Sequence, residues 1–336
     1  AASDPTGGAG MQADVLPLAS MGCHPLPVVT ALPVQDTAGV DGILAIDSEW
    51  VADQARMLLE DVPVAAFKLG MLGSPESIAV IAEILADYPD IPVVLDPVLA
   101  SGRGDELASD DMIAAMRDML IPQTSVLTPN SHEARRLALF DSDEDDLDLA
   151  ACAARLTELG CEYVLVTGTH ENTPRVLNSL YDAKGHVQTD AWDRLPGSYH
   201  GSGCTLASAI AAALAYGHDV PGAVRDAQNF TYEALKAAFR PGMGQYIPER
   251  FFWAQDVQTE GAAAVSGRGR ARRRRGRRAV PRQIRRRRAP PRTGERARRA
   301  VPAPRRAARR QRRSAARRPR RRRRRPPGAR RRQRTR

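Results

Sequence analysis

The charge of this chain is divided between two very different segments, and this division limits what can fold. Residues 261–336 contain 36 arginines, no lysine and one acidic residue, Glu295, so their formal charge is +35. Residues 1–260 contain 14 basic and 38 acidic residues, so their formal charge is −24. The basic segment has no Phe, Tyr, Trp, Leu or Met, and it cannot bury a hydrophobic core. We therefore expect one folded domain in residues 1–256 and a disordered tail in residues 257–336.

The Arg/Pro/Ala-rich tail has three alternative interpretations. Dense arginine neutralises phosphates, so the tail could be an arm that binds nucleic acid or another polyanion. It could also be a solvated tail without a role. A third interpretation is a frame artefact of a GC-rich gene, because basic arms usually mix Lys with Arg. No aromatic side chain interrupts the charge, so any binding of nucleic acid would be independent of sequence.

Apolar runs and cysteine spacing exclude two further classes of protein. No apolar run approaches the ~18–20 residues that a membrane span needs, and no signal peptide opens the chain. We expect no membrane contact and a cytoplasmic location. The cysteines contain no CxxC pair and no metal-ligand spacing, so we expect four free thiols rather than a disulfide or zinc scaffold. They are Cys23, Cys152, Cys161 and Cys204.

Short apolar runs alternate with amphipathic stretches along residues 1–255. The expected strands are residues 27–32, 64–69, 91–95, 125–127 and 163–167, and the expected helices are residues 76–88, 110–120, 147–159 and 205–216. The strands lack polar alternation, which indicates a mainly parallel sheet with both faces covered by helices. Residues 177–181 and 187–189, joined through Lys184 and Gly185, predict a hairpin added late in this sheet.

A glycine-rich loop opens the chain at residues 1–10. A loop of this kind connects a strand to a helix, and no strand-forming residues precede it. We therefore expect a truncated start in which the first strand is missing. Its loss would lower the stability and the activity of the domain, or in the extreme prevent folding.

The strongest chemical signal is the segment 199–205, which enters an apolar helix through small residues. Backbone N–H groups of Ser202, Gly203 and Cys204, together with the helix dipole, would attract a phosphate or a developing phosphoryl anion. A thiol at a helix N-terminus has a lowered pKa, so Cys204 is a candidate base or nucleophile. The segment is not a P-loop, because the lysine of that motif is absent. The alternative is an ordinary helix start with a small buried cysteine.

Six motifs follow one another along residues 1–255: SDPTGGAGMQAD at 3–14, TALPVQDT at 30–37, KLGML at 68–72, VLDPV at 94–98, TPNSHE at 128–133 and HGSGCT at 200–205. In this order they resemble the hydroxymethylpyrimidine/phosphomethylpyrimidine kinases of thiamine biosynthesis, which belong to the ribokinase-like superfamily. The resemblance implies a three-layer αβα fold with a mainly parallel central sheet. It also implies ATP-dependent phosphorylation of 4-amino-5-hydroxymethyl-2-methylpyrimidine and then of its monophosphate. The tail has no counterpart in the family pattern.

The resemblance places the catalytic group at the glycine-rich helix start. Gly201, Ser202, Gly203 and Cys204 would form the anion hole for the transferred phosphoryl group. Cys204, as a thiolate, would take the proton of the substrate hydroxymethyl group as general base. Many sugar kinases of the superfamily carry Asp at this position, so the cysteine favours pyrimidine or pyridoxal-type substrates.

A magnesium site is implied by the motif that contains Asn130 and Glu133, which resembles the superfamily's Asn-x-x-Glu element. Mg²⁺ keeps several waters and few carboxylates, so Glu133 would act partly through water. Asp96, at the carboxyl end of an expected strand, would support the same metal–phosphate network. The alternatives are a turn or cap residue for Asp96 and an ordinary first-turn carboxylate for Glu133.

The pyrimidine contacts implied by the resemblance are Gln35, Asp4, Asp14 and Met71. The amide of Gln35 can pair with a ring nitrogen and an exocyclic amine, whereas the alternative is a surface turn residue. Asp4 and Asp14 line the opening loop in the family pattern. Met71 would supply an apolar wall, or would be plain core.

Nucleotide contacts are implied at Thr167 and Gly168, together with Asn130. Thr167 stands where the family usually carries a lysine, which makes this contact the least supported. The resemblance further implies ATP and Mg²⁺ as cofactors and a homodimer as the assembly.

Two alternative functions remain open at this point. Pyridoxal kinases are related to this family and share its fold, so a few pocket residues decide between pyridoxal and the pyrimidine. A protein of another class would be an inactive kinase domain whose tail binds a polyanion. The acidic domain repels nucleic acid, so only the tail could bind it.

Overall fold

Six strands form one sheet within the residues that the computed structural model describes, which are 1–101, 104–139 and 147–254. Their order is β3 (Phe67–Leu69), β4 (Val93–Leu95), β5 (Val126–Leu127), β6 (Tyr163–Thr167), β7 (Arg175–Asp182) and β8 (Gly185–Asp193). The strands β3 to β6 pair in parallel, and β7 and β8 pair antiparallel as the expected hairpin. The mainly parallel sheet and the late hairpin are confirmed. The predicted tail lies outside the described residues.

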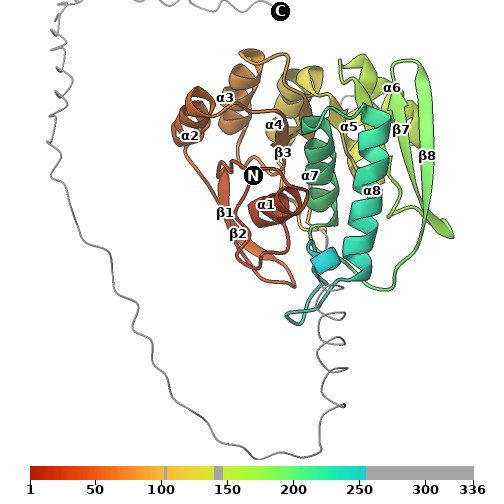
Figure 1. The fold of residues 1–336 in the computed structure, drawn as a ribbon. Coiled ribbons are helices and arrows are strands. Elements are labelled where there is room, and N and C mark those ends of the chain that lie inside the picture. Colours follow the sequence, from red (N-terminus) through yellow and green to blue (C-terminus); the bar gives the residue numbers. More distant parts are fainter. Residues whose placement is uncertain (102–103, 140–146, 255–336) are drawn as a thin grey trace, which may run out of the picture. The chain divides into compact units, whose positions relative to one another are not determined.

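Both faces of this sheet are covered by helices (Figure 1). Val93 and Leu95 belong to one apolar core and Val94, between them, belongs to the other, which explains why the strand sequence does not alternate. The helices that contribute to the first core are α2 (Ser48–Asp61), α3 (Pro75–Ala86), α4 (Asp110–Ala115), α5 (Ser131–Ala138) and α6 (Leu149–Glu158). The second core contains α7 (Ser202–Ala215) and α8 (Val220–Lys236). The three-layer αβα prediction is therefore confirmed.

Two expected elements differ from the structure. The expected strand 27–32 is wrong in its first part, because β1 runs from Ala31 to Gln35 and pairs antiparallel with β2 (Val40–Ala45) outside the main sheet. Pro27 lacks a backbone N–H and cannot take part in a ladder in the usual way. The expected helix 110–120 is α-helical only as far as Ala115, and continues as a π-helical turn over Met116–Leu120 and a 3₁₀ turn over Ile121–Gln123.

The opening loop leads directly into α1 (Gly10–Ser20), which packs beside α7. Among the described residues, no helix is long and apolar enough to cross a bilayer. All four cysteines are free thiols, as expected; Cys152 and Cys161 are buried, and Cys23 and Cys204 are partly exposed.

Candidate active site

The parallel strands bring the predicted site segments to one edge of the sheet. Leu95 pairs with Leu127, so Asp96 after β4 and the 128–133 segment after β5 leave the sheet on the same side. Asn130 forms a parallel bridge with Thr167 at the end of β6. Ligands of open α/β sheets bind at the carboxyl ends of the strands. The structure thus brings together the predicted metal and nucleotide residues, although what they bind stays a prediction.

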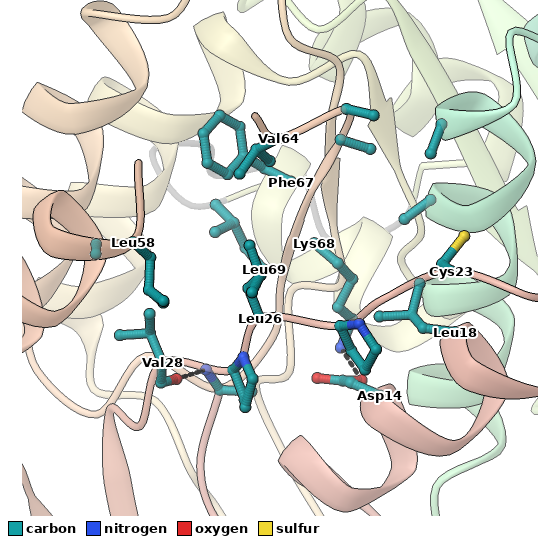
Figure 2. A pocket seen from close by; sticks show the side chains of 18 of the residues that line it. Asp14, Leu18, Cys23, Leu26, Val28, Leu58, Val64, Phe67, Lys68 and Leu69 are labelled. Atoms are coloured by element: carbon teal, nitrogen blue, oxygen red, sulfur yellow. Dashed lines mark hydrogen bonds and ion pairs between the residues drawn. The ribbon is translucent and has the colours of Figure 1, made fainter. Parts of the chain in front are cut away.

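A buried lysine that the sequence analysis did not single out lies at the centre of the site. The Nζ atom of Lys68 is 2.7 Å from Oδ1 of Asp14 (Figure 2). It is also 3.7 Å from Oδ2 of Asp96. Ser208 also donates a hydrogen bond of 2.9 Å to Oδ1 of Asp14. Burial by itself lowers the pKa of Lys68, but the negative groups around it, Asp14 first among them, together outweigh burial and raise that pKa above the usual range. Lys68 therefore remains a buried cation.

The second carboxylate beside Lys68 belongs to Asp96. It is 5% exposed, and its Oδ2 atom makes no hydrogen bond within the described part of the chain. Burial raises the pKa of Asp96, although Lys68 opposes the rise. A Cβ atom on Gly203 would lie 3.7 and 3.8 Å from its two carboxylate oxygens. The carboxylate thus faces the beginning of α7, and its role in a metal–phosphate network stays a prediction.

The helix α7 begins three residues earlier than expected, at Ser202, so that Ser202, Gly203 and Cys204 all lie in its first turn. These first-turn N–H groups have no intrahelical partner, and no side chain among the described residues caps them. Gly201, the N-cap, has φ +77°, and a Cβ there would lie 2.0 Å from the carbonyl oxygen of Gly8. Only glycine therefore allows this close contact between the helix start and the opening loop.

The predicted acidity of Cys204 is wrong. Although its side chain is partly exposed, burial raises the pKa of the thiol to about 12, and the positive charge of Lys68 only partly opposes this rise. The carboxylates of Asp96 and Asp14 raise it further. The lowering of the thiol pKa that a helix N-terminus causes is therefore outweighed by desolvation and by neighbouring negative charge. The thiol is protonated at neutral pH.

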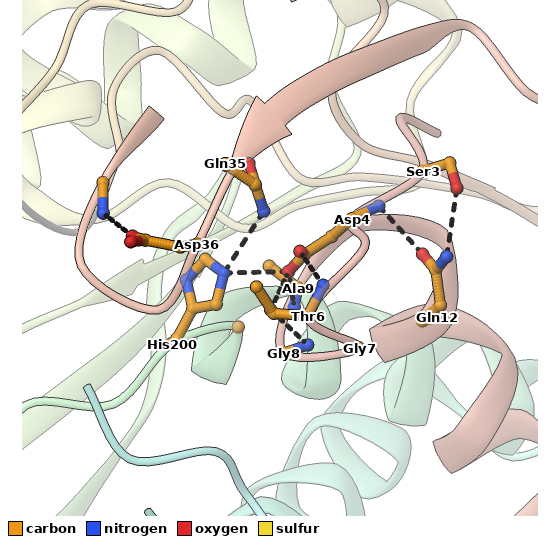
Figure 3. Close-up of polar contacts among 12 residues, drawn as sticks. Ser3, Asp4, Thr6, Gly7, Gly8, Ala9, Gln12, Gln35, Asp36 and His200 are labelled. Atoms are coloured by element: carbon orange, nitrogen blue, oxygen red, sulfur yellow. Dashed lines mark hydrogen bonds and ion pairs between the residues drawn. The ribbon is translucent and has the colours of Figure 1, made fainter. Parts of the chain in front are cut away.

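The opening loop is held around the carboxylate of Asp4, which is 2% exposed (Figure 3). Its oxygens accept hydrogen bonds from the Thr6 and Ala9 backbone and from Nε2 of His200, at 2.8, 2.7 and 2.9 Å. Burial alone raises the pKa of Asp4, but the bond from His200 and the backbone bonds lower it well below its usual range. The Nε2 atom of Gln35 lies 3.5 Å from the same imidazole nitrogen.

Arg250 joins the opening loop to α7. It is 2% exposed, and its guanidinium donates to the carbonyl oxygens of Gly7 and Gly8 and to Oγ1 of Thr205. Arg250 was not singled out from the sequence, because an isolated arginine carries no local signal. His200 was quoted within the 200–205 motif but was given no role.

The helix α5 begins with a closed cap. Asn130 accepts a hydrogen bond from the Glu133 backbone, and Oε2 of Glu133 accepts one from the Asn130 backbone, both at 2.9 Å. The other oxygen, Oε1, accepts from the backbone N–H of Leu99 at 3.3 Å. Burial raises the pKa of Glu133 to about 8, and nearby Asp96 adds to the rise. The first-turn carboxylate weighed as the alternative for Glu133 is confirmed as a capping role, and the metal role stays a prediction.

The remaining predicted residues lie around this centre. The backbone N–H of Gly168 donates to Oδ1 of Asn178, and a Cβ on Gly168 would lie 2.2 Å from the carbonyl oxygen of Leu177. Met71 is half-buried, and its carbonyl oxygen accepts a hydrogen bond from Oγ1 of Thr30. Among the described residues, no cluster of three or more His, Cys, Asp or Glu side chains is arranged around a metal position.

The family model described as phosphomethylpyrimidine kinase matches residues 4–249. The chain is 41% identical over 247 residues to the hydroxymethylpyrimidine/phosphomethylpyrimidine kinase of Mycobacterium tuberculosis (strain ATCC 25618 / H37Rv), which covers 73% of this chain and 89% of that protein. It is 38% identical over 248 residues to the kinase of the same name from Streptomyces coelicolor, covering 73% and 90%.

The chain belongs to the phosphomethylpyrimidine kinase family. The predicted family, the phosphotransferase class and the place in thiamine biosynthesis are thereby confirmed.

Solved structures agree on the ribokinase-like fold. The pyridoxal kinase of Bacillus subtilis in complex with ADP superposes with a TM-score of 0.68 at 26% identity, covering 76% of this chain and 96% of that one. The phosphomethylpyrimidine kinase of Clostridium difficile 630 gives 0.60 at 30% identity, covering 70% and 96%. A structure of the Staphylococcus aureus pyridoxal kinase contains AMP-PCP, and the use of ATP by this kinase family agrees with it.

Proposed function

We propose that this protein transfers the γ-phosphoryl group of ATP to the hydroxymethyl group of 4-amino-5-hydroxymethyl-2-methylpyrimidine, and then a second phosphoryl group to the monophosphate. In each step an oxygen–phosphorus bond forms to the acceptor, and the bond from the γ-phosphorus to the bridging oxygen of ADP breaks. The observation that carries this proposal is the first turn of α7, which faces the carboxylate of Asp96, whose Oδ2 atom has no hydrogen-bond partner among the described residues.

The first turn of α7 supplies the groups that the transfer needs. N–H groups of Ser202, Gly203 and Cys204 stabilise charge on the transferred phosphoryl oxygens, and they require no side-chain movement to do so. Cys204 is the proposed general base: its S–H proton first leaves to solvent, and the resulting thiolate accepts the hydroxymethyl proton. Lys68 favours that ionisation, because its positive charge lowers the pKa of Cys204.

Magnesium is the proposed metal, and two carboxylates suit it. Asp96 offers a buried oxygen without a hydrogen-bond partner, and Glu133 lies close enough for the two charges to interact. An oxygen-only donor set with room for water is what Mg²⁺ prefers. When bound, the ion neutralises charge on the phosphates. Asn130, Thr167 and Gly168 are the proposed nucleotide contacts, at the neighbouring strand ends.

Gln35 and Met71 are the proposed contacts of the pyrimidine ring, and Asp4 and Asp14 act by holding the site together. The oxygens of Asp4 accept bonds within the opening loop and from His200, which places Asp4 as the support of His200 and Gln35. Asp14 fixes Lys68 from the side of α1.

Pyridoxal is the second candidate substrate. The solved pyridoxal kinases superpose on this chain with the higher TM-scores, whereas the curated relatives are named as pyrimidine kinases.

We also propose a cytoplasmic homodimer. Its support is an apolar stripe on the β1–β2 ribbon, where Leu32 and Leu44 are directly paired and 44% and 64% exposed, and Val34 is 65% exposed. Apolar side chains gathered on an exposed ribbon favour a protein contact.

A mass-spectrometric assay of the full chain with ATP and Mg²⁺ tests the proposed function. The pyrimidine, its monophosphate and pyridoxal are offered separately, and Cys204→Ala is run in parallel. We expect monophosphate and then diphosphate of the pyrimidine, both strongly reduced in the variant. Phosphorylation of pyridoxal alone would select the second candidate, and absence of product from a folded chain would contradict the kinase.

A further inference from the structure

The guanidinium of Arg250 links two segments that are far apart in the sequence. Its Nη1 and Nη2 atoms donate to the carbonyl oxygens of Gly7 and Gly8, at 3.2 and 2.6 Å. Its Nε atom donates to Oγ1 of Thr205 in the first turns of α7, at 3.1 Å. A planar guanidinium presents its donors in a rigid fork. Because Arg250 is also almost completely buried, its three bonds hold the opening loop and α7 in one relative position.

The contact continues from Thr205 to the N-cap residue of α7. The hydroxyl of Thr205 accepts from Arg250 and donates to the carbonyl oxygen of Gly201 at 2.8 Å. On its other side, Gly201 lies directly against the opening loop, since a Cβ there would be 2.0 Å from the carbonyl oxygen of Gly8. Arg250 therefore holds Gly201 from two sides, through Thr205 and through Gly8.

The backbone that carries Arg250 is itself anchored near these groups. The N–H of the preceding residue, Glu249, donates to the carbonyl oxygen of Ala234 in α8 at 3.0 Å. The N–H of His200 donates to the carbonyl oxygen of Tyr246 at 2.8 Å, so the same segment runs beside the residues that lead into α7. The side chain of Arg250 thus reaches the opening loop from a fixed position.

The buried charge of Arg250 has no carboxylate partner. Its three acceptors are neutral, and it forms no ion pair with any described residue, whereas Lys68 is paired with Asp14. A guanidinium stays protonated in proteins. A buried charge of this kind is costly in a folded protein unless an anion completes it. The phosphoryl group that the α7 start would receive is such an anion.

We propose that Arg250 is a positioning residue of phosphoryl transfer, which holds the opening loop at a fixed distance from the anion hole of α7. This role rests on the proposed function, in which the loop supports the pyrimidine contacts through Asp4 and His200 (Figure 3). The distance that Arg250 sets is then the one between the acceptor hydroxymethyl group and the transferred phosphorus. A misplacement of about 1 Å between reacting groups can cost about 100-fold in rate.

Kinetics and ligand binding of the full chain carrying Arg250→Lys test this role. Lysine keeps the charge, but its single ammonium group lacks the fork that reaches acceptors on two segments. We expect kcat to fall by about 100-fold, while the Kd values of Mg²⁺–AMP-PCP and of the pyrimidine, measured by calorimetry, change by less than about threefold. A residue that only stabilised the fold would lower Tm and leave the kcat of the folded chain unchanged.

Arg240→Lys is the matched control. Arg240 lies shortly before Arg250 in the chain, and its guanidinium donates to the carbonyl oxygens of Met243 and Gly244 within its own loop. Its replacement breaks carbonyl contacts of the same kind without separating the opening loop from α7. The kcat of this variant should stay within about twofold of the wild-type value.

Thr205→Val is a second test variant, and it carries the test if Arg250→Lys does not fold. Valine keeps the shape of the side chain and removes the hydroxyl between Arg250 and Gly201. We expect kcat to fall by about 10-fold, again with little change in the two Kd values. The double variant should be no slower than Arg250→Lys alone, because both changes act through one contact.

An unchanged kcat in the folded test variant would overturn the role of Arg250. So would a fall in kcat with an equal loss of affinity for either ligand, or single effects that multiply in the double variant. A folded wild type without turnover would contradict the proposed function and this role with it. An active wild type beside an equally active Arg250→Lys would contradict this role alone.

Discussion

The helices α5 and α7 both begin at the carboxyl edge of the same sheet, but they differ in how their first turns are capped. At α5, Asn130 and Glu133 cap each other, and the remaining oxygen of Glu133 is bonded to Leu99. At α7, the N-cap is Gly201, and no side chain of the described residues accepts a hydrogen bond from the N–H groups of Ser202, Gly203 or Cys204. The polar groups at the α5 start stabilise the helix itself. The α7 start leaves its N–H groups and the positive end of the helix dipole available to a ligand.

The surroundings of the two helix starts strengthen this contrast. The α7 start faces Asp96, whose buried oxygen has no hydrogen-bond partner among the described residues, and Lys68 lies next to that carboxylate. Buried polar groups without hydrogen-bond partners are costly in a folded protein, unless a bound ligand supplies the missing partners. The comparison therefore favours the α7 start as the proposed site of phosphoryl transfer, with α5 in a mainly structural role.

A large loss of activity is expected from Gly201→Ala at the α7 start. Its Cβ would lie 2.0 Å from the Gly8 carbonyl oxygen at a positive φ, so either the opening loop or the helix start must move. We expect kcat/KM to fall by at least about 100-fold, the loss seen when one oxyanion donor is displaced.

Gly217→Ala is the matched control for this change. Gly217 has φ +81° and nothing within 4 Å of an added Cβ, so it carries only the backbone penalty of about 1–2 kcal/mol. Steady-state kinetics of both variants should show lost activity for Gly201→Ala alone. Their Tm values measure the backbone penalty that the two changes share. Equal kinetics would mean that contact with the opening loop is irrelevant.

Cys204→Ala should lower kcat by about 10²–10⁴-fold with little change in Tm, because general-base catalysis is lost while packing is nearly kept. Cys152→Ala should give the opposite result. This buried thiol belongs to α6 and packs in the core, so the variant should lose stability and keep its kcat. Kinetics and calorimetry on the two variants separate the roles. A Cys204→Ala enzyme with normal kcat would remove the thiol from the mechanism.

At the α5 start, Glu133→Gln should change the pH dependence of stability. Burial raises the pKa of Glu133 from the ordinary 4.5 to about 8, so the folded protein holds this proton more tightly than the unfolded chain. Its contribution is complete below about pH 4.5 and is lost as the pH rises toward 8. We expect the unfolding free energy of the wild type to fall between pH 5 and 8 by a few kcal/mol more than that of Glu133→Gln.

Urea denaturation in EDTA at the two pH values measures this difference. The matched control is Asp148→Asn, which replaces the exposed N-cap carboxylate of α6 and should leave the wild-type pH dependence unchanged. Parallel curves for wild type and Glu133→Gln would refute the raised pKa.

The smallest expected effect is that of Asn130→Ala, which removes one half of the α5 capping box. We expect a loss of about 1 kcal/mol in unfolding free energy. If Asn130 also contacts the nucleotide, as proposed, KM for ATP should rise while kcat changes less. An unchanged KM would restrict Asn130 to capping.

Much of the fold could be predicted from residue order alone. Strands β3 to β6 and the β7–β8 hairpin follow from unbroken apolar runs and a Lys-Gly turn, because burial on both faces leaves a local trace in the sequence. The expected strand 27–32 was displaced onto Ala31–Gln35, because the strand's bounds depend on its pairing with β2, which the 27–32 run does not show. Lys68 was quoted within a motif but given no role, because its importance lies in two carboxylates 54 and 28 positions away along the chain.

By itself, the sequence determined the layer architecture, the family and the segments that meet at the site, because these depend on local periodicity and on short motifs. Only the tertiary structure decided the protonation of Cys204, the pairing of Lys68 between Asp14 and Asp96, and the contact of Arg250 with both the opening loop and α7. Each of these depends on which distant groups are brought within a few ångströms and on how much water they lose. A helix N-terminus visible in the sequence favours a thiolate, whereas the burial and negative charge gathered around it favour the thiol.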